Sequence, residues 1–257
     1  MKPRDQVVVV TGGGRGIGAA LCRRFAAEGA AAVVVADVDG GAAEAVASEI
    51  GGEGRPLDVT DERAVAAMVA EVVREHGRID LYCSNAGIAL GRGPETEDAD
   101  WQRIWDVNTM SHVLMARHVV PAMLAAGGGY LLGTISAAGL LNALTSAPYG
   151  MTKAAALSFF EWLAIAYGDR IRVSCLCPQG VRTRMLELDD GMGALLRESA
   201  LAPEEVAGAV VAGLAEERFL ILPHPEVATY FERKASDYDR WLRGMRRLRA
   251  TVAGTEP

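Results

Sequence analysis

Short apolar runs rich in valine alternate along the chain with longer stretches whose apolar residues recur at helical spacing. The runs have the length of strands, and we predict strands at 6–10, 31–36, 54–57, 79–84, 129–135, 170–177 and 219–222. Helices are predicted near 16–28, 41–49, 61–76, 98–126, 148–167 and 203–215, with a last one after 225. This alternation predicts an α/β fold, in which helices cover both faces of a doubly wound parallel sheet of about seven strands.

Nothing in the pattern divides the chain. No linker rich in Pro, Gly and Ser separates two regions, and no repeat recurs at a fixed period, so we expect a single domain over 1–257. The segments 89–100 and 183–200 lack a clear pattern. Long irregular loops on such a sheet are usually functional, and we interpret 183–200 as a substrate loop. We expect an amphipathic helical extension at about 225–250, with arginines on its solvated side.

Composition and charge narrow the class of protein. Apolar residues make up 50% of the chain and charged residues 23%, as in a soluble globular protein. No apolar run approaches the ~20 residues of a membrane helix, and no apolar leader follows the N-terminus, so we expect a cytoplasmic protein. The net charge of −7 argues against a nucleic-acid binder. The four cysteines form no CxxC, which favours buried thiols over a metal site.

A glycine-rich segment connects the first predicted strand to the first predicted helix. It reads Thr11-Gly12-Gly13-Gly14-Arg15-Gly16-Ile17-Gly18. Glycines allow a sharp turn and a close approach to a pyrophosphate, which the free N–H groups of a helix N-terminus stabilise. Asp37 ends the second strand about 20 residues later, where an acid binds both ribose hydroxyls and repels a 2′-phosphate. We therefore favour NAD over NADP, although Arg15 is a cation that could meet such a phosphate.

Two tyrosines precede a lysine by four residues, a spacing that places both side chains on one face of a helix. The pairs are Tyr149 with Lys153 and Tyr230 with Lys234. Spacing alone does not choose between them. Ser136 ends a predicted strand thirteen residues before Tyr149, whereas Glu217 stands thirteen residues before Tyr230. Only the first pair has a partner hydroxyl, so we predict that the first pair is catalytic.

Tyrosine suits the removal of a proton from an alcohol as hydride leaves its carbon. A tyrosine of pKa near 10 is mostly protonated at pH 7, and lowering that pKa by ~3 units needs about 4 kcal/mol. We expect Lys153 and a positive nicotinamide to share that work, and Ser136 to hydrogen-bond the substrate oxygen. The sequence thus predicts an oxidoreductase that transfers hydride between NAD(H) and a secondary alcohol or ketone, with Tyr149 as general acid/base.

The spacing TGxxxGxG of residues 11–18 resembles the short-chain dehydrogenase/reductase family, and the resemblance extends through most of the chain. It is carried by Asp58-Val59, Ser84-Asn85-Ala86-Gly87 and Pro178-Gln179-Gly180-Val181-Arg182-Thr183, which resemble the adenine contact, the NNAG turn and the PGxVxT segment. Ser84 and Gln179 depart from the family pattern. Singly, each segment has an ordinary alternative, such as a helix cap at Asp58. Together they stand at successive strand ends, where open α/β sheets bind ligands.

The resemblance implies a Rossmann fold and several residue roles. Thr183 is expected to contact the nicotinamide carboxamide, Lys153 to bind the nicotinamide ribose as well, and Asn108 to anchor a water that joins Lys153 to solvent. A homo-oligomer, either a dimer or a homotetramer, is also implied. The residues expected to bind the cofactor are Gly12, Arg15, Gly16, Ile17, Gly18, Asp37, Asp58, Val59, Asn85, Ala86, Gly87, Tyr149, Lys153, Pro178, Gly180, Val181 and Thr183.

Other activities are compatible with the same residues. An NADP-dependent carbonyl reductase and an epimerase or dehydratase stay open, while the intact set Asn108, Ser136, Tyr149 and Lys153 argues against a non-catalytic nucleotide-binding regulator. The substrate is expected to be a small, mainly apolar alcohol or ketone, with no nucleic-acid or membrane partner. Residues placed in its pocket by adjacency to the motifs are Ala138, Leu140, Leu144, Ser146, Gln179, Met185 and Met192.

Overall fold

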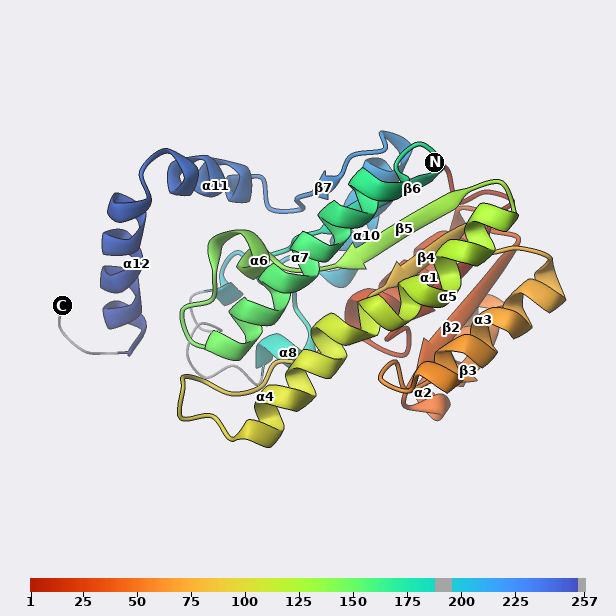
Figure 1. Ribbon diagram of the computed structural model, residues 1–257, viewed down its shortest axis with the longest axis horizontal. Coiled ribbons are helices and arrows are strands. Elements are labelled where there is room, and N and C mark those ends of the chain that lie inside the picture. The colour runs from red at the N-terminus through yellow and green to blue at the C-terminus, as the bar shows by residue number, and fades with distance from the viewer. Residues whose placement is uncertain (188–195, 254–257) are drawn as a thin grey trace.

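One parallel sheet forms the centre of the protein (Figure 1). The computed structural model describes residues 1–187 and 196–253. Within them the strand order is β3-β2-β1-β4-β5-β6-β7. The strands are β1 (Val7–Thr11), β2 (Ala32–Asp37), β3 (Glu53–Pro56), β4 (Leu81–Ser84), β5 (Gly129–Thr134), β6 (Ile171–Leu176) and β7 (Leu220–Ile221). All seven predicted strands are confirmed, and so is the doubly wound, Rossmann-like fold.

Helices cover both faces of this sheet. They are α1 (Gly16–Ala27), α2 (Gly40–Ile50), α3 (Glu62–His76), α5 (Ser111–Ala125), α7 (Ala147–Tyr167) and α10 (Pro203–Ala215). Successive side chains of a strand point to opposite faces. Val7 and Val9 therefore pack with α3, α5 and α7, and Val8 and Val10 pack with α1, α2 and α10. Burial on both faces explains why the strands are continuous apolar runs rather than alternating ones.

The order of the strands creates a crevice at the carboxyl ends of β1 and β4. The chain builds β1, β2 and β3 outward on one side, then crosses to β4 on the other side of β1. Ligands bind at such a reversal because the connections leave in opposite directions and open a gap. The glycine-rich segment follows β1 and the turn Asn85–Gly87 follows β4. Two short helices, α6 (Ala137–Leu141) and α8 (Arg184–Glu187), lie beyond β5 and β6 at the same edge and were not predicted.

The long helix predicted at 98–126 is interrupted. It consists of α4 (Asp98–Trp105), a π-helical turn η1 (Asp106–Met110) and then α5. A π turn holds one extra residue and is found mostly at functional sites. Asn108, the central residue of η1, is fully buried, and its side chain hydrogen-bonds the main chain of Ile88. Because the π turn adds a residue, the Asn108 side chain points towards Ile88, a direction that it would not take in an uninterrupted α-helix.

The C-terminal extension consists of two helices where the pattern predicted one. They are α11 (Glu226–Ser236) and α12 (Tyr238–Ala253). Asp237 between them has an extended backbone, and its carboxylate accepts a hydrogen bond from the Arg240 N–H, which caps α12. α11 packs on α6, whereas α12 packs mainly on α11 and stands at the left edge of the view in Figure 1. No helix in the described part of the chain is long and apolar enough to cross a membrane.

Candidate active site

A large cleft opens at the carboxyl edge of the sheet. Its volume is about 2650 Å³, well above the 300–1,000 Å³ of an ordinary ligand pocket. Eighteen of the nineteen residues that the sequence assigned to catalysis or cofactor binding, counting Tyr149 and Lys153 once, lie along its walls. The exception is Asn108, which is buried behind the wall. The cleft is therefore roomy enough for a dinucleotide and a second ligand.

The glycine-rich segment presents free main-chain donors to the cleft. Arg15 precedes α1 without a side-chain cap, and the first turn of α1 contains no acid. The N–H groups there are consequently available to an anion. Gly12 has a φ of +63°, and a Cβ at Gly18 would lie 2.0 Å from the Gly12 carbonyl oxygen. The segment therefore folds only with glycine at these two positions, and it fits a pyrophosphate.

Asp37 is held by the main chain at the end of β2. Its Oδ2 accepts a hydrogen bond of 3.0 Å from the Gly14 N–H, and its Oδ1 accepts one of 3.0 Å from the Asp39 N–H. Arg15, the cation that weakened the case for NAD, is paired with Asp39. Its guanidinium and the Ala42 N–H hold the pKa of the Asp39 carboxyl below its usual value, with the Ala42 bond the larger cause. The positive charge of the loop is thus offset by a neighbouring carboxylate.

Asn85 joins three strand ends beneath the cleft. Its Nδ2 donates to the Thr11 and Gly12 carbonyls at 3.0 and 3.2 Å, and its Oδ1 accepts from the Thr134 hydroxyl at 2.9 Å. The Thr134 carbonyl in turn accepts a 3.0 Å hydrogen bond from Lys153 Nζ. This network links the glycine-rich segment to Lys153. Sequence reasoning missed Thr134, and its only signal was its position two residues before Ser136 at a strand end.

Tyr149 lies in the first turn of α7. Ser146 begins this helix as its N-cap, because its Oγ accepts from the Tyr149 N–H at 3.2 Å and donates to the Leu90 carbonyl at 3.0 Å. The phenol lies within hydrogen-bonding reach of the Ser136 hydroxyl. Burial raises the pKa of Tyr149 above 10, and the bond to Ser136 opposes that rise without cancelling it. The protein alone therefore holds the phenol protonated, so the expected lowering has to come from added positive charge.

Lys153 is buried one turn further along α7. Its Nζ lies 5.8 Å from the centre of the Tyr149 ring and bonds the Thr134 carbonyl, and only 3% of the residue is exposed. Burial lowers the pKa of Lys153 from 10.5 to about 8. No described carboxylate is paired with it, which is unusual for a buried ammonium. The site therefore keeps a cation close to the phenol at a cost in stability.

Asn108 is wholly engaged by the protein. Its Oδ1 accepts from the Ile88 N–H and its Nδ2 donates to the Ile88 carbonyl, both at 2.9 Å, with a longer bond of 3.3 Å from Nδ2 to the Thr152 hydroxyl. These bonds fix the chain just after the turn Asn85–Gly87. Asn108 is therefore positioned to hold the cleft wall in place, and the water that the family resemblance places here stays an expectation.

The segment after β6 forms the roof of the cleft. The Gln179 N–H donates a 3.2 Å hydrogen bond to Nδ1 of His224, a buried residue that sequence reasoning missed. Gly180 is needed because a Cβ there would lie 2.7 Å from the Leu196 carbonyl oxygen. Val181 forms an isolated parallel β-bridge with Leu201. The two ends of the predicted substrate loop are thereby brought together.

The remaining predicted residues line the cleft, are buried in the hydrophobic core, or lie outside the described residues. Asp58 bonds Thr60 and faces the cleft, and the cap of α3 is Asp61, so the alternative that Asp58 caps that helix is wrong. Leu140 does not line the cleft, because it is buried in the hydrophobic core. Met192 lies outside the described residues. The other pocket residues line the cleft, and they are Ala138, Leu144, Ser146, Gln179 and Met185.

The second tyrosine–lysine pair does not come together. Lys234 Nζ donates to the Leu140 carbonyl and lies 5.5 Å from the ring centre of Tyr238. Tyr230 packs against the hydrophobic core at the wall of the cleft. The pair therefore helps to attach α11 to α6, and the first pair is the one beside a serine hydroxyl.

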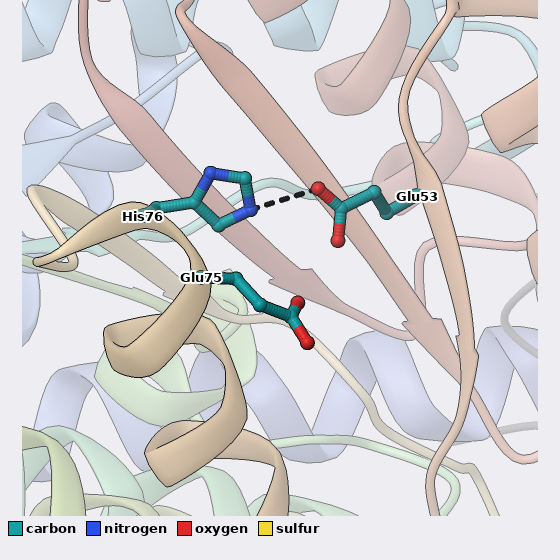
Figure 2. A group of neighbouring side chains, drawn as sticks. All are labelled: Glu53, Glu75 and His76. Atoms are coloured by element: carbon teal, nitrogen blue, oxygen red, sulfur yellow. Dashed lines mark ion pairs between the residues drawn. The ribbon is translucent and has the colours of Figure 1, made fainter.

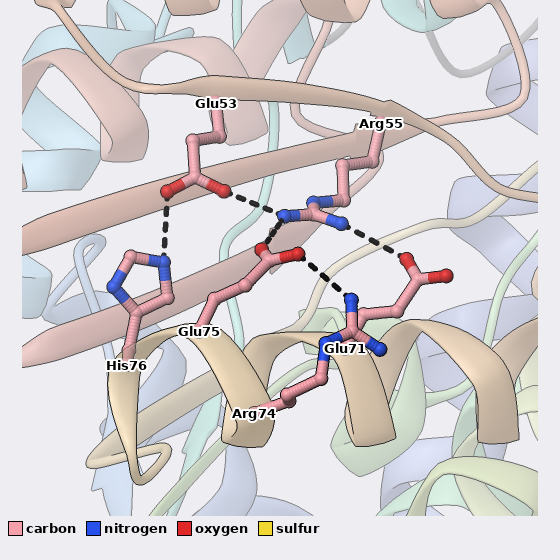
Figure 3. Close-up of polar contacts among 6 residues, drawn as sticks. All are labelled: Glu53, Arg55, Glu71, Arg74, Glu75 and His76. Atoms are coloured by element: carbon pink, nitrogen blue, oxygen red, sulfur yellow. Dashed lines mark hydrogen bonds and ion pairs between the residues drawn. The ribbon is translucent and has the colours of Figure 1, made fainter.

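A second cluster of titratable side chains lies at the edge strand β3, away from the cleft. Glu53, Glu75 and His76 bring three potential ligand atoms within 4.8 Å of one another (Figure 2). Arg55 lies among them, however, and pairs with Glu53, Glu71 and Glu75 (Figure 3). Its guanidinium holds the pKa of Glu75 below its usual value. Because the carboxylates are already paired, we interpret this cluster as an ion-pair network that fastens β3 to α3.

Comparisons with known proteins agree with the geometry. Residues 6–191 match the family model described as short chain dehydrogenase. The chain is 34% identical over 240 residues to 1-deoxy-11-beta-hydroxypentalenate dehydrogenase of Streptomyces arenae, covering 88% of this chain and 85% of that protein. It is 36% identical over 229 residues to meso-2,3-butanediol dehydrogenase of Serratia marcescens, covering 84% and 90%. A short chain dehydrogenase/reductase from Burkholderia phymatum, solved in complex with NAD, has a TM-score of 0.83 and 27% identity over 93% of this chain and 96% of that chain.

Proposed function

The chain belongs to the short chain dehydrogenase family, and on that premise we propose that it interconverts a secondary alcohol and a ketone with NAD(H), using Tyr149 as general acid/base. The protein is an NAD(P)-dependent oxidoreductase that acts on an alcohol or ketone. The observation that carries the assignment of roles is the meeting of Tyr149, Ser136 and Lys153 in a cleft floored by the glycine-rich segment.

The roles follow from what each side chain can do. A nicotinamide cofactor, when bound, would supply the hydride chemistry at the carbinol carbon. Tyr149 takes the hydroxyl proton in one direction and donates it in the other. Ser136 hydrogen-bonds the same oxygen and keeps it beside the phenol. Lys153 stabilises the phenolate, because a cation nearby favours the charged form of a buried acid.

The cofactor fits the residues along the cleft floor. The uncapped first turn of α1 would hold the pyrophosphate and Asp37 the adenosine ribose, with Asp58 and Val59 beside the adenine. Lys153 would bind the nicotinamide ribose, and the Pro178–Thr183 segment would hold the carboxamide. Thr183 supports this, since its Cγ2 would lie 3.1 Å from a Cβ on Gly16, so it stands directly over the glycine-rich segment.

Asp37 should make the enzyme prefer NAD+ over NADP+. Its carboxylate would repel a 2′-phosphate, and Arg15 is engaged by Asp39. In Asp37→Ser, we expect the ratio of kcat/KM for NAD+ to that for NADP+ to fall by about tenfold or more, a change of about 1.4 kcal/mol. The measurement is NADH or NADPH formation over a panel of secondary alcohols.

The companion variant Asp39→Ser frees Arg15 while leaving Asp37 in place. We expect it to gain affinity for NADP+ without losing affinity for NAD+. Equal use of both cofactors by the wild-type protein would contradict the assignment to NAD.

The substrate is a secondary alcohol or the matching ketone, with its reacting end in an apolar part of the cleft. Leu144, Met185 and Ala138 line that part beside Tyr149. The butanediol named for the Serratia relative carries its hydroxyls on secondary carbons, which supports this class. We infer the substrate class from these two observations together.

We also propose a cytoplasmic homo-oligomer that buries the outer face of α7. On that face Trp162 is 53% exposed and Ile165 is 85% exposed, and Trp162 stacks on Phe159. An apolar strip of this kind favours contact with a second copy. The four cysteines are free and buried, which suits a reducing compartment.

Charging that face should dissociate the assembly. For Trp162→Asp with Ile165→Asp, we expect light scattering to give the 27.2 kDa monomer, while the wild-type protein gives a multiple of that mass. Leu242→Asp is the matched control, because it charges an exposed leucine on α12 instead. A wild-type protein that is already monomeric would rule out the assembly.

A further inference from the structure

The C-terminal helix α12 forms the outer wall of the active-site cleft. Trp241, Met245, Leu248 and Val252 line the cleft opposite the glycine-rich segment and the loop at 89–95. All four are half-buried, although α12 packs mainly on α11. Trp241 also packs against the main hydrophobic core. The apolar side of α12 is therefore turned towards the active site rather than towards solvent.

The arginines on this wall pair with no carboxylate of the described residues. Arg233, Arg240, Arg247 and Arg249 line the cleft and are exposed. In residues 1–187 and 196–225, ten arginines pair with acids that the structure also describes. Among the described residues, by contrast, no acid pairs with an arginine of α11 or α12. These guanidinium groups are consequently free to bind an anion.

The local charge has the opposite sign to that of the whole chain. Residues 226–253 carry seven basic and four acidic side chains, a net charge of +3, whereas the chain carries −7. Two of the acids line the cleft, and Asp237 uses its carboxylate to cap α12. A positive wall on an acidic protein attracts anions to the cleft mouth.

We propose that the substrate is an anionic alcohol or ketone, whose carboxylate or phosphate binds one of the arginines that flank the apolar side of α12, Arg240 or Arg249, while its apolar part lies against Trp241 and Leu248. This rests on the proposed function, because it assumes that the carbinol end lies at Tyr149. Arginine binds both kinds of anion through paired N–H groups. The apolar residues that line the same cleft, among them Leu144, Met185 and Trp241, suit an extended hydrocarbon part.

The orientation of α12 favours a ligand in the cleft over a membrane surface. A helix that binds a membrane surface buries its apolar side there, but the apolar side of α12 faces the cleft. Here Arg243 and Arg246 lie on the side of α12 away from the cleft, while Arg240 and Arg249 line the cleft with the apolar residues. These two pairs of arginines lie on the same helix and differ in the side of the helix that they occupy, so variants of one pair are a matched control for variants of the other.

A homologous series of (ω−1)-hydroxy fatty acids and their methyl esters tests the proposal. Each acid carries a secondary alcohol at one end and a carboxylate at a distance set by chain length, and the ester removes only the charge. Calorimetric titration into the protein with NADH reads binding alone, since an alcohol and NADH do not react. A matching series of hydroxyalkyl phosphates distinguishes the two anions.

We expect the best acid to bind roughly ten- to a hundredfold more tightly than its ester in the wild-type protein. In Arg240→Gln with Arg249→Gln, the acid and ester should bind alike, and in Arg243→Gln with Arg246→Gln the preference should persist. Equal binding of acid and ester by the wild-type protein overturns the proposal, as does equal loss in the two double variants. Binding to phosphatidylglycerol vesicles without any acid preference would assign the helix to a membrane surface instead.

The anion-binding wall and the catalytic role of Tyr149 can be tested separately. If the esters are oxidised with NAD+ but acids gain nothing, the arginine wall is wrong and the oxidoreductase assignment stands. If Tyr149→Phe oxidises acids or esters as fast as the wild-type protein does, the assignment of Tyr149 is wrong.

Discussion

Replacing Tyr149 by phenylalanine should lower kcat by a factor on the order of 10² to 10⁴ while leaving the Kd for NADH nearly unchanged. The ring stays in place at the start of α7, and only the hydroxyl that bonds Ser136 is removed. The variant therefore keeps the cleft but has no group to take or give the proton. Steady-state oxidation of a secondary alcohol, followed by NADH absorbance, measures the loss, and fluorescence titration measures the binding.

Tyr167→Phe is the matched control, because Tyr167 ends the same helix and contacts Trp162 away from the cleft. This variant should keep wild-type kcat. Tyr230→Phe tests the other tyrosine–lysine pair, and its pH profile for kcat should keep the wild-type shape. A Tyr149→Phe enzyme that retains more than about a tenth of the activity would refute the acid/base role.

Replacing Lys153 by methionine should weaken turnover and strengthen the fold at neutral pH. The lost ammonium no longer stabilises the phenolate, and a hydrogen bond to a charged group accounts for about 1.5–3 kcal/mol, or roughly 10- to 150-fold in kcat/KM. In the folded protein, burial lowers the pKa of Lys153 from 10.5 to about 8. Keeping this lysine charged therefore costs about 3 kcal/mol, of which the bond to Thr134 returns about 1.

The sign of the stability effect depends on pH. The folded wild-type protein binds fewer protons than the unfolded chain between pH 8 and 10.5, so its free energy of unfolding rises with pH in that range. The gain of about 2 kcal/mol in Lys153→Met should therefore be full below pH 8 and disappear towards pH 10.5. Urea unfolding at several pH values measures it. A variant that is less stable than wild type at pH 7 would contradict the cost assigned to the buried charge.

Lys234→Met provides the comparison within the other pair. Its ammonium bonds the Leu140 carbonyl and does not line the cleft. We expect a loss of about 1 kcal/mol in stability from that hydrogen bond, and no loss of kcat. The contrast separates a lysine that attaches a helix from one that serves the reaction.

Local patterns in the sequence were sufficient to predict the strands and the parallel sheet. Valine runs with both faces apolar predicted parallel strands, and the glycine-rich segment and Asp37 lie together because carboxyl ends of parallel strands share one edge. The family resemblance, and not the periodicity, predicted that residues far apart in the chain, such as Gly16 and Thr183, line one cleft. The order of the motifs along the chain was thus the main basis for the predicted site.

What the sequence did not predict depends on contacts between distant segments. The π turn places the Asn108 side chain within hydrogen-bonding distance of the Ile88 main chain, and no periodicity in the sequence indicates that bond. Thr134 matters because it lies between Asn85 and Lys153, which follow different strands. The pKa of Tyr149 is raised rather than lowered in the protein alone, since burial outweighs its bond to Ser136. Propensity describes single elements, whereas these features arise from packing.

The most direct test of the central claim is a single-turnover experiment with a secondary alcohol that carries deuterium on its carbinol carbon. Wild-type protein and Tyr149→Phe are mixed with stoichiometric NAD+, and deuterated NADH is followed by mass spectrometry over a range of pH. The account predicts that wild type transfers the deuterium, at a rate that rises with pH until the phenol is ionised. It predicts that the variant binds NADH yet transfers label at least about 10²-fold more slowly. Transfer by the variant at the wild-type rate and with the same pH dependence would show that another group moves the proton.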